Sequence, residues 1–358
     1  MASEVFLCSG IHQDVSILIL HAWLASIILP MKPASIPWNL PGWQSEVHDW
    51  IDTQLARHAL QRTGEITQPH IRPWSTVLGV PTDAGRLYFK ATAPYLSYEP
   101  ALTAYLARLR PDISPDLLAV DIPRGWMLMR ESGIALRTFI KTEHSLARWR
   151  EIMPLYAGLQ KEMAPRVDEI LKLGVLDRRL ETLPAQFERL VADKAALLVG
   201  QPDSLTEEEY QRLTVSVAGF ERQCAELAAF GLPTTLHHDD FHDGNLFVQD
   251  ERVIFTDWGE SAVTHPFFTL VVMLRGAENS LQLAPDSPEL AQMRAWYLSQ
   301  WTDYAPLAEL QSVVRLAERL GLVNRALTWQ RVISNLPDEL KPEYALAVPS
   351  YLQEFINQ

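Results

Sequence analysis

The stretch LHHDDFHDGNLFV, residues 236–248, joins a polar loop to the start of an apolar strand. A turn and a second apolar strand follow, and that strand leads into Asp257 and Trp258. The loop holds Asp240 and Asn245 five positions apart. This set of two carboxylates and one amide is typical of kinase-type phosphoryl transfer. One carboxylate receives a hydroxyl proton, and the other two groups hold Mg²⁺ on the nucleotide phosphates.

The composition is that of a folded, acidic protein. The 358 residues are 47% hydrophobic and 21% charged, and the formal net charge is −13. Because no basic surplus exists to release counterions, we expect no binding to nucleic acid. A cationic substrate is compatible with the acidic balance, although solubility explains that balance more simply. Two cysteines, Cys8 and Cys224, cannot form a disulfide framework, which indicates a cytoplasmic location.

Residues 1–42 are interpreted as an N-terminal extension. Residues 15–31 form an uncharged, largely apolar run, but the run contains polar residues and a proline, and no basic residue precedes Lys32. A membrane span needs about 20 apolar residues, and a signal peptide needs a basic start. The alternatives are a weak anchor, an extra helix packed on the body, or an over-extended reading frame whose true start is Met31. We favour the last two and expect no membrane association.

The next part of the chain alternates strand and helix patterns. Apolar spacing predicts a helix from Trp43 to about Leu60, and the Asp-Ala-Gly turn at 83–85 predicts an antiparallel hairpin. The remaining expected elements are strands at 71–80, 86–91, 117–120 and 125–130 and a helix at 99–109.

Beyond Glu131 helical patterns dominate. The capping box Thr206-Glu207-Glu208-Glu209 marks the start of one helix, and the hairpin at 246–256 is expected to be an island of β structure. The pattern therefore predicts an α+β fold, with a small antiparallel sheet lobe at 43–130 and a larger helical lobe at 131–358. A ligand cleft is expected between the lobes.

Lys90 ends one of the predicted strands, and Glu99 opens the helix that follows. A lysine on a sheet that faces a glutamate on an adjacent helix can form an ion pair that directs the ammonium at nucleotide phosphates. Taken alone, these two residues favour the simpler interpretation of a solvated lysine at a strand end and a glutamate that suits a helix N-terminus.

The pattern His-x-Asp-x-x-x-x-Asn fits His238, Asp240 and Asn245, and the spacing selects Asp240 rather than Asp239. With Asp257-Trp258 after the hairpin, the chain resembles the aminoglycoside phosphotransferase and choline kinase-like family, distant relatives of the protein kinases. The resemblance extends over most of the chain from about Trp43. It includes the strand at 85–90, the helix from 99 and a hinge-like segment at 125–131.

The resemblance implies a protein-kinase-like, two-lobed fold and a role for each matching residue. Asp240 would be the catalytic base or hydroxyl-orienting carboxylate, and His238 would brace the loop. The remaining implied site residues are Asn245 and Asp257 for Mg²⁺, Lys90 held by Glu99 for the α and β phosphates, and Met129 to Glu131 for the adenine.

Three departures from the family pattern are visible. The usual glycine between His238 and the catalytic carboxylate is Asp239, which would face solvent, approach the metal or contact a cationic substrate; we favour solvent. The nucleotide-covering loop at about 72–75 contains no glycine. The family's further acidic anchor after the second metal motif is missing, so we assign His265 no chemical role.

Two other interpretations compete. The cluster of histidines and aspartates at 237–243 is similar to the metal ligands of phosphohydrolases, but those sites usually lie within helices, whereas a β segment follows here. A nucleotide-binding protein that has lost catalysis is the second alternative. All four chemically required residue types are present, which favours an active enzyme.

The acceptor pocket is expected in the helical part after Phe268. Aromatic residues at 296–304 together with Asp303 could hold an ammonium group, although a stripe packed into the core is the simpler interpretation. Glu260 lies nearer to the expected chemistry and is the better candidate for an acceptor contact, with Asp239 as a second. We therefore predict a monomeric or homodimeric ATP- and Mg²⁺-dependent transferase. This small-molecule kinase would phosphorylate a hydroxyl of an amino alcohol, an amino sugar or an aminoglycoside-like compound.

Overall fold

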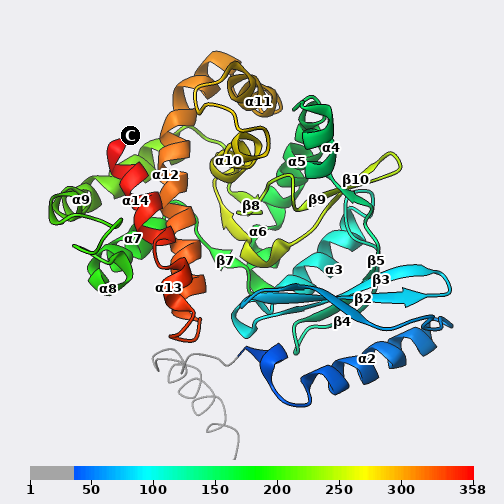
Figure 1. The fold of residues 1–358 in the computed structure, drawn as a ribbon. Helices are drawn as coiled ribbons and strands as arrows, with labels where there is room; N and C mark the ends of the chain where they lie inside the picture. The colour runs from blue at the N-terminus through cyan, green and yellow to red at the C-terminus, as the bar shows by residue number, and fades with distance from the viewer. Residues whose placement is uncertain (1–35) are drawn as a thin grey trace, which may run out of the picture.

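Five antiparallel strands form the sheet of the N-terminal part, in the order β1-β2-β3-β5-β4 (Figure 1). The computed structural model describes residues 36–358, so the apolar run at 15–31 lies outside the described residues. The strands are β1 (Thr67–Ile71), β2 (Ser75–Thr82), β3 (Gly85–Thr92), β4 (Leu117–Asp121) and β5 (Trp126–Arg130). Gly85, with a φ of 100°, closes the β2–β3 hairpin, which confirms the expected turn.

Two helices cover opposite faces of this sheet (Figure 1). Helix α2 (Trp43–Arg57) buries Val47, Ile51 and Leu55 against strand residues such as Phe89. Helix α3 (Glu99–Leu109) turns Leu102 and Leu106 toward the core of the helical part instead. Helix α3 therefore connects the sheet to the rest of the molecule and places Glu99 at the boundary between the two hydrophobic clusters.

The expected strand at 71–80 is wrong at its start. The segment Arg72-Pro73-Trp74 separates β1 from β2, and the backbone N–H of Arg72 donates to the carbonyl of Ser75 at 2.9 Å. Pro73 has no N–H to donate to a ladder, so a continuous strand is disfavoured there. Trp74 instead packs edge-on against Trp329 and Tyr344 of the C-terminal helices, with ring centroids at 6.1 and 5.3 Å.

The remainder of the chain is mainly helical, as expected. The helices are α4 (Leu136–Glu143), α5 (Trp149–Met163), α6 (Val167–Lys172), α7 (Leu183–Ala192), α8 (Lys194–Leu197), α9 (Glu207–Ala229), α10 (Thr269–Leu281), α11 (Pro288–Ser299), α12 (Leu307–Ser334), α13 (Lys341–Tyr344) and α14 (Ala347–Asn357). The capping box predicted at the start of α9 is confirmed, because Thr206 and Glu209 bond reciprocally through side chain and backbone.

The hairpin of β9 (Leu246–Gln249) and β10 (Arg252–Phe255) is not an isolated unit. Strand β6 (Ile134–Ala135) pairs with β9 and makes a sheet of three strands. A second sheet of three strands joins β7 (Leu176–Asp177), β11 (Ala262–Thr264) and β8 (Thr235–His237). The second sheet holds the two ends of the segment that carries the polar loop, because β8 precedes the loop and β11 follows Asp257.

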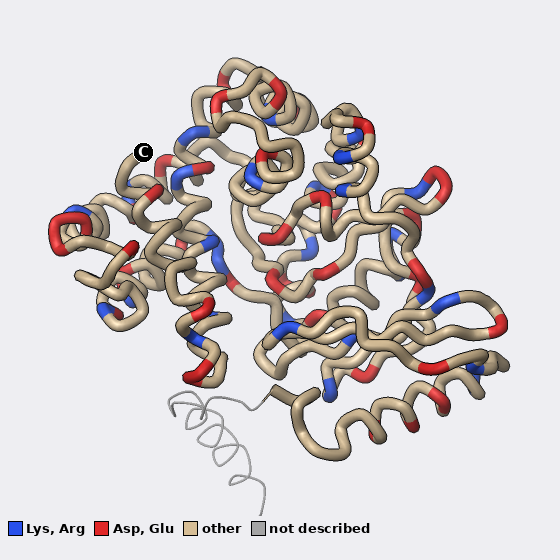
Figure 2. The backbone as a smooth tube through the Cα atoms, in the orientation of Figure 1, with Lys and Arg blue, Asp and Glu red and all other residues tan. Residues whose placement is uncertain are grey.

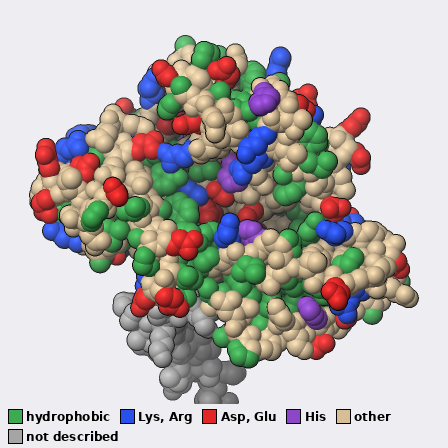
Figure 3. All heavy atoms as spheres, in the orientation of Figure 1, with side chains coloured by type: hydrophobic (Ala, Val, Ile, Leu, Met, Phe, Trp, Pro, Cys, Tyr) green, Lys and Arg blue, Asp and Glu red, His purple; other side chains and the backbone are tan. Residues whose placement is uncertain are grey.

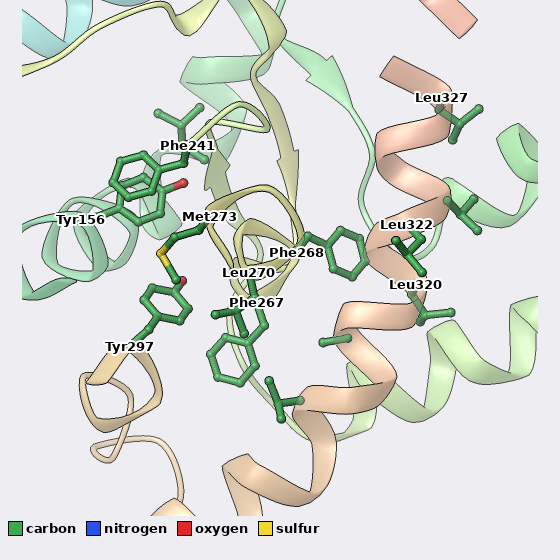
Figure 4. Packing of buried hydrophobic residues seen from close by; sticks show 14 of the residues in the cluster. Tyr156, Phe241, Phe267, Phe268, Leu270, Met273, Tyr297, Leu320, Leu322 and Leu327 are labelled. Carbon is green, nitrogen blue, oxygen red and sulfur yellow. The ribbon is translucent and has the colours of Figure 1, made fainter. Parts of the chain in front are cut away.

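The polar loop is anchored in the hydrophobic core. Phe241 is fully buried and stacks on Tyr156 of α5 with ring centroids 3.8 Å apart, while Phe268 points toward α12 (Figure 4). Burying one such ring contributes about 2 to 3 kcal/mol. The loop backbone is therefore fixed by packing as well as by hydrogen bonds.

Of the aromatic residues at 296–304, Tyr297 and Trp301 pack into this core, Trp296 is partly buried against it, and Tyr304 is 45% exposed. Tyr297 and Trp301 are 0% exposed, and the Lys161 ammonium lies 2.6 Å from Asp303 and over the Trp301 ring. The simpler interpretation of this stripe is therefore confirmed, and the cation at this place is the protein's own lysine. Within residues 36–358, no helix is long and apolar enough to span a membrane.

Candidate active site

A cavity of about 570 Å³ lies between the N-terminal sheet and the polar loop. Its lining brings together Lys90, Met129, Asn245 and Asp257, four of the residues that the sequence selected. Figure 3 shows acidic, basic and histidine side chains gathered in the recess between the two parts of the molecule. Strand β3, the end of strand β5 and the β9–β10 hairpin region thus contribute to one site.

Lys90 forms two ion pairs at the base of this cavity. Its Nζ lies 2.7 Å from Glu99 Oε1 and 2.7 Å from Asp257 Oδ1. Burial lowers the pKa of Lys90, but the carboxylates of Asp257 and Glu99 outweigh that effect, so its net pKa is raised and the side chain is an ammonium. The predicted pairing of Lys90 with Glu99 is present, and it includes Asp257 as well.

Asn245 forms hydrogen bonds to Asp240 within the polar loop. Its Nδ2 donates to the backbone carbonyl of Asp240 at 3.0 Å and to Asp240 Oδ2 at 2.9 Å. The backbone N–H and the hydroxyl of Thr256 both donate to the Asn245 carbonyl, at 3.0 and 2.9 Å. These contacts direct the amide nitrogen of Asn245 at Asp240, and within residues 36–358 no hydrogen bond engages its amide oxygen, which can therefore act as a ligand.

His238 braces the loop as expected. Its Nε2 lies 2.8 Å from the Thr256 carbonyl, and its Nδ1 accepts from the backbone N–H of Asp240 at 3.3 Å. Burial lowers the pKa of His238 to about 4, so the ring is neutral, with Nε2 as the donor and Nδ1 as the acceptor. The ring therefore links the polar loop to the strand that ends near Asp257.

The two expected metal ligands offer a suitable donor set. Asp257 has a φ of 65°, a left-handed conformation that Asp tolerates better than most residues, and its side chain is 45% exposed. Amide and carboxylate oxygens are the donors that Mg²⁺ prefers, and two protein ligands suffice when phosphates supply others. Asn245 and Asp257 thus fit Mg²⁺. Among residues 36–358 there is no group of three or more His, Cys, Asp or Glu that could hold a metal ion.

Asp239 does not face solvent, so the favoured interpretation of this side chain is wrong. Its side chain is 2% exposed, because three polar partners surround it. Those partners are His237 Nε2 at 3.0 Å, Asn324 Nδ2 at 2.8 Å and the hydroxyl of Thr328. Asp239 has a φ of 59°, which explains why a glycine suits this position in the family pattern.

Arg325 is the central residue that the sequence did not reveal. It projects from α12, is buried, and donates to Asp240 Oδ1 at 3.0 Å and to the Asp239 carbonyl at 3.0 Å. It also pairs with the Glu260 carboxylate. Glu260, predicted to contact an acceptor, is therefore already paired with a cation of the protein.

The pKa of Asp240 reflects this neighbourhood. Burial raises the pKa of the carboxyl, but the Arg325 guanidinium and His242 lower it further, so the net shift is downward. Asp240 is thus an ionised, weakly basic carboxylate. Such a group suits orientation of a hydroxyl in a loose phosphoryl-transfer transition state more than strong base catalysis.

Arg137 is a second contributor that the sequence did not reveal. Extending from α4, it donates through Nε to Asp243 at 2.8 Å and lies 3.1 Å from His242 Nδ1. A Cβ at position 244 would lie 2.9 Å from the Arg137 guanidinium carbon and 2.7 Å from His242 Cε1, so a side chain there would displace both groups. Arg137 and His242 line the large cavity and also a smaller one of about 350 Å³ that reaches Asp240.

Met129 and Glu131, expected to contact the adenine, have different surroundings. The Glu131 carbonyl accepts from Gln249 Nε2 at 3.2 Å, and its N–H donates to the Arg86 carbonyl at 3.3 Å. Met129, by contrast, lines the cavity together with Ser132. The backbone groups of Glu131 are thus engaged by the protein itself, and Met129 also pairs with Tyr88 in the sheet, but of the two only Met129 lines the cavity.

Comparison with known proteins places this site in a family. The profile of the phosphotransferase enzyme family matches residues 84–310. Among curated proteins, no sequence relative is found.

Solved structures share the fold at low sequence identity. An ethanolamine kinase from Plasmodium vivax aligns with a TM-score of 0.61 at 11% identity, covering 98% of this chain and 95% of that one. A choline kinase from Streptococcus pneumoniae gives 0.55 at 15% identity, with 86% and 99% covered. A macrolide 2'-phosphotransferase from Brachybacterium faecium gives 0.52 at 16%, with 84% and 98% covered. These likenesses confirm the predicted α+β, protein-kinase-like fold.

Proposed function

Because this chain belongs to the phosphotransferase enzyme family, we propose that it transfers the γ-phosphoryl group of ATP to a hydroxyl of a small molecule. One observation carries the proposal. Lys90, Asn245 and Asp257 surround the large cavity, while Asp240, bonded to Asn245, lines the smaller cavity beside it. A phosphoryl donor in the first cavity would thus lie next to an acceptor in the second.

Each residue has a defined task in this reaction. Lys90 presents an ammonium to the nucleotide phosphates, and Glu99 fixes its direction. Asn245 and Asp257 would hold Mg²⁺, which neutralises phosphate charge when bound. Asp240 accepts a hydrogen bond from the acceptor hydroxyl and so orients its oxygen toward the phosphorus atom.

The transfer exchanges one P–O bond for another. The bond between the γ-phosphorus and the bridging oxygen breaks, and a bond to the acceptor oxygen forms. The hydroxyl proton passes to an Asp240 carboxylate oxygen and then to solvent. ADP and a phosphate monoester leave.

The proposal is tested by incubating the protein and MgATP with a metabolite extract, and comparing native protein with the Asp240→Asn variant by mass spectrometry. We expect a species that gains one phosphoryl group with native protein and forms about 10³-fold more slowly with the variant. Nucleotide affinity should change by less than about threefold, because Asp240 lies outside the large cavity.

A matched control is Asp250→Asn in the exposed β9–β10 turn, where a φ of 54° suits Asn as well as Asp. This variant should keep full activity. Equal turnover in the native protein and Asp240→Asn would contradict the assignment of Asp240. Nucleotide binding without transfer to any acceptor would favour the alternative of a catalytically silent nucleotide-binding protein.

A further inference from the structure

The smaller cavity, of about 350 Å³, has a lining unlike that expected for a cationic acceptor. Residues of α4, α10, α12 and α14 surround it together with the polar loop. Figure 2 shows Lys and Arg positions on α4, α10 and α12, three of the helices whose residues line this cavity. The charged side chains of the lining are Arg137, Lys141, Arg275, Arg325 and Asp240, with His242 beside them.

Four cations thus face one carboxylate. That carboxylate, Asp240, already has the Arg325 guanidinium 3.0 Å away, so it offers little to an incoming ammonium. Lys141 and Arg275 line this cavity but not the larger one, so they are placed for the acceptor rather than for the nucleotide.

Two of these guanidinium groups, those of Arg137 and Arg275, are held in place by carboxylates that do not line the cavity. Arg137 pairs with the buried Asp243 at 2.8 Å, and Arg275 pairs with Glu354 and lies over the Tyr351 ring at 4.6 Å. A guanidinium has five N–H donors, so one carboxylate partner leaves others free for a ligand. Fixed donors of this kind recognise carboxylates and phosphates by paired hydrogen bonds.

We propose that the acceptor carries an anionic group, a carboxylate or a phosphate, which Lys141 and Arg275 bind while its hydroxyl lies at Asp240. This inference rests on the proposed function and replaces the amino alcohol, amino sugar or aminoglycoside expected from the sequence. The net charge of −13 belongs to the whole chain and does not describe this cavity. An ammonium ligand would meet four cationic side chains here, and the carboxylates that pair with Arg137 and Arg275, Asp243 and Glu354, are not part of the lining.

A binding experiment without nucleotide tests the charge preference directly. D-glucose, D-glucosamine, D-gluconate and D-glucose 6-phosphate form a series of similar size and different charge, and each is titrated up to 10 mM by calorimetry. We expect gluconate, glucose 6-phosphate or both to bind at least tenfold more tightly than glucose and glucosamine. Which of the two binds distinguishes a carboxylate from a phosphate ligand.

Two variants locate the binding. Arg275→Gln and Lys141→Gln should each weaken binding of the acidic probe at least tenfold, and each should raise the acceptor KM more than the ATP KM. The controls are Arg315→Gln and Lys172→Gln, which remove exposed cations outside this lining and should bind as the native protein does. Arg275 also contacts α14, so Lys141→Gln provides the second test if Arg275→Gln fails to fold.

The outcomes separate this inference from the proposed function. Anion binding that depends on Lys141 and Arg275, without phosphoryl transfer, supports the inference and contradicts the function. Phosphorylation of an amino alcohol or aminoglycoside in preference to acidic hydroxyl compounds supports the function and overturns the inference. Absence of binding by both acidic probes, or tighter binding of glucosamine, also overturns it.

Discussion

Arg325 Nη2 lies 3.0 Å from Asp240 Oδ1, while Asn245 Nδ2 lies 2.9 Å from Oδ2 of the same carboxylate. The two donors fix the carboxylate from opposite sides, one from α12 and one from the catalytic loop. Both favour the ionised form. The orientation and the charge of Asp240 therefore depend on a helix that is remote in the sequence.

Replacement of Arg325 by Gln tests this dependence. We expect kcat to fall by about 10- to 100-fold, because the carboxylate loses its fixed orientation. Since Arg325 lowers the pKa of Asp240, the variant should also raise that pKa. Activity that requires ionised Asp240 would then be lost at a higher pH as the solution is acidified. An unmoved acid limb in the pH profile of kcat/KM would show that Arg325 does not act through Asp240; Arg315→Gln serves as the control.

Lys90 stabilises two carboxylates at once, and its removal should be costly. In Lys90→Met, the buried Glu99 loses its partner, and the free energy of unfolding should fall by about 3 kcal/mol. The double variant Lys90→Met/Glu99→Gln removes the unpaired charge and should recover part of that loss. Urea unfolding measures the stability of the single and the double variant. In both variants, nucleotide affinity should be at least tenfold weaker than in the native protein. Equal stability of the single and double variants would contradict a buried ion pair.

The parts of the site that the sequence revealed are local. The loop, the hairpin and the Lys90–Glu99 pair lie within short segments whose spacing reflects one secondary structure. Arg325 stands 85 positions from Asp240, and Arg137 stands 106 positions from Asp243. No periodicity links such pairs, because only the packing of α4 and α12 on the loop brings them together.

The fold was predictable to a similar extent. Helices α3 and α9 and the β2–β3 hairpin follow from apolar spacing and from turn and cap residues. Strands β6, β7, β8 and β11 have two or three residues each, too few for an alternating pattern. They exist because neighbouring strands satisfy their backbone groups, which is a property of the assembled structure.

Asp239 illustrates a position where the family pattern misleads. Glycine would suit the φ of 59°, yet the Asp239 carboxylate accepts from His237, Asn324 and Thr328 in the buried core. Asp239→Gly should therefore lower the free energy of unfolding by about 3 kcal/mol, because three buried donors lose their acceptor. Asp239→Asn keeps one acceptor oxygen, so its free energy of unfolding should lie between those of the native protein and Asp239→Gly. A glycine variant as stable as the native protein would show that the backbone strain outweighs the network.

The free energy of unfolding should depend on pH through His265, whose buried ring caps the 3-10 turn Pro266–Phe268 just before α10. Burial lowers the pKa of His265 to about 3, and its Nδ1 accepts from the backbone N–H of Phe267 at 3.2 Å. In the unfolded chain His265 binds a proton near pH 6.5, whereas in the folded chain it stays neutral down to about pH 3. The contribution of His265 is therefore fully present above pH about 6.5 and declines as the pH falls toward the folded pKa. Between pH 6.5 and pH 4 the free energy of unfolding should fall by roughly 3 kcal/mol through His265.

The variant His265→Asn keeps an acceptor for the Phe267 N–H and removes the titrating group. Its free energy of unfolding, measured by urea denaturation from pH 7.5 to 4, should decline less steeply than that of the native protein. His238, also neutral through burial, leaves a residual slope in both proteins. The control is His144→Asn at an exposed position with a φ of 48°, which should reproduce the native slope. Parallel curves for native protein and His265→Asn would mean that His265 does not stay neutral in the fold.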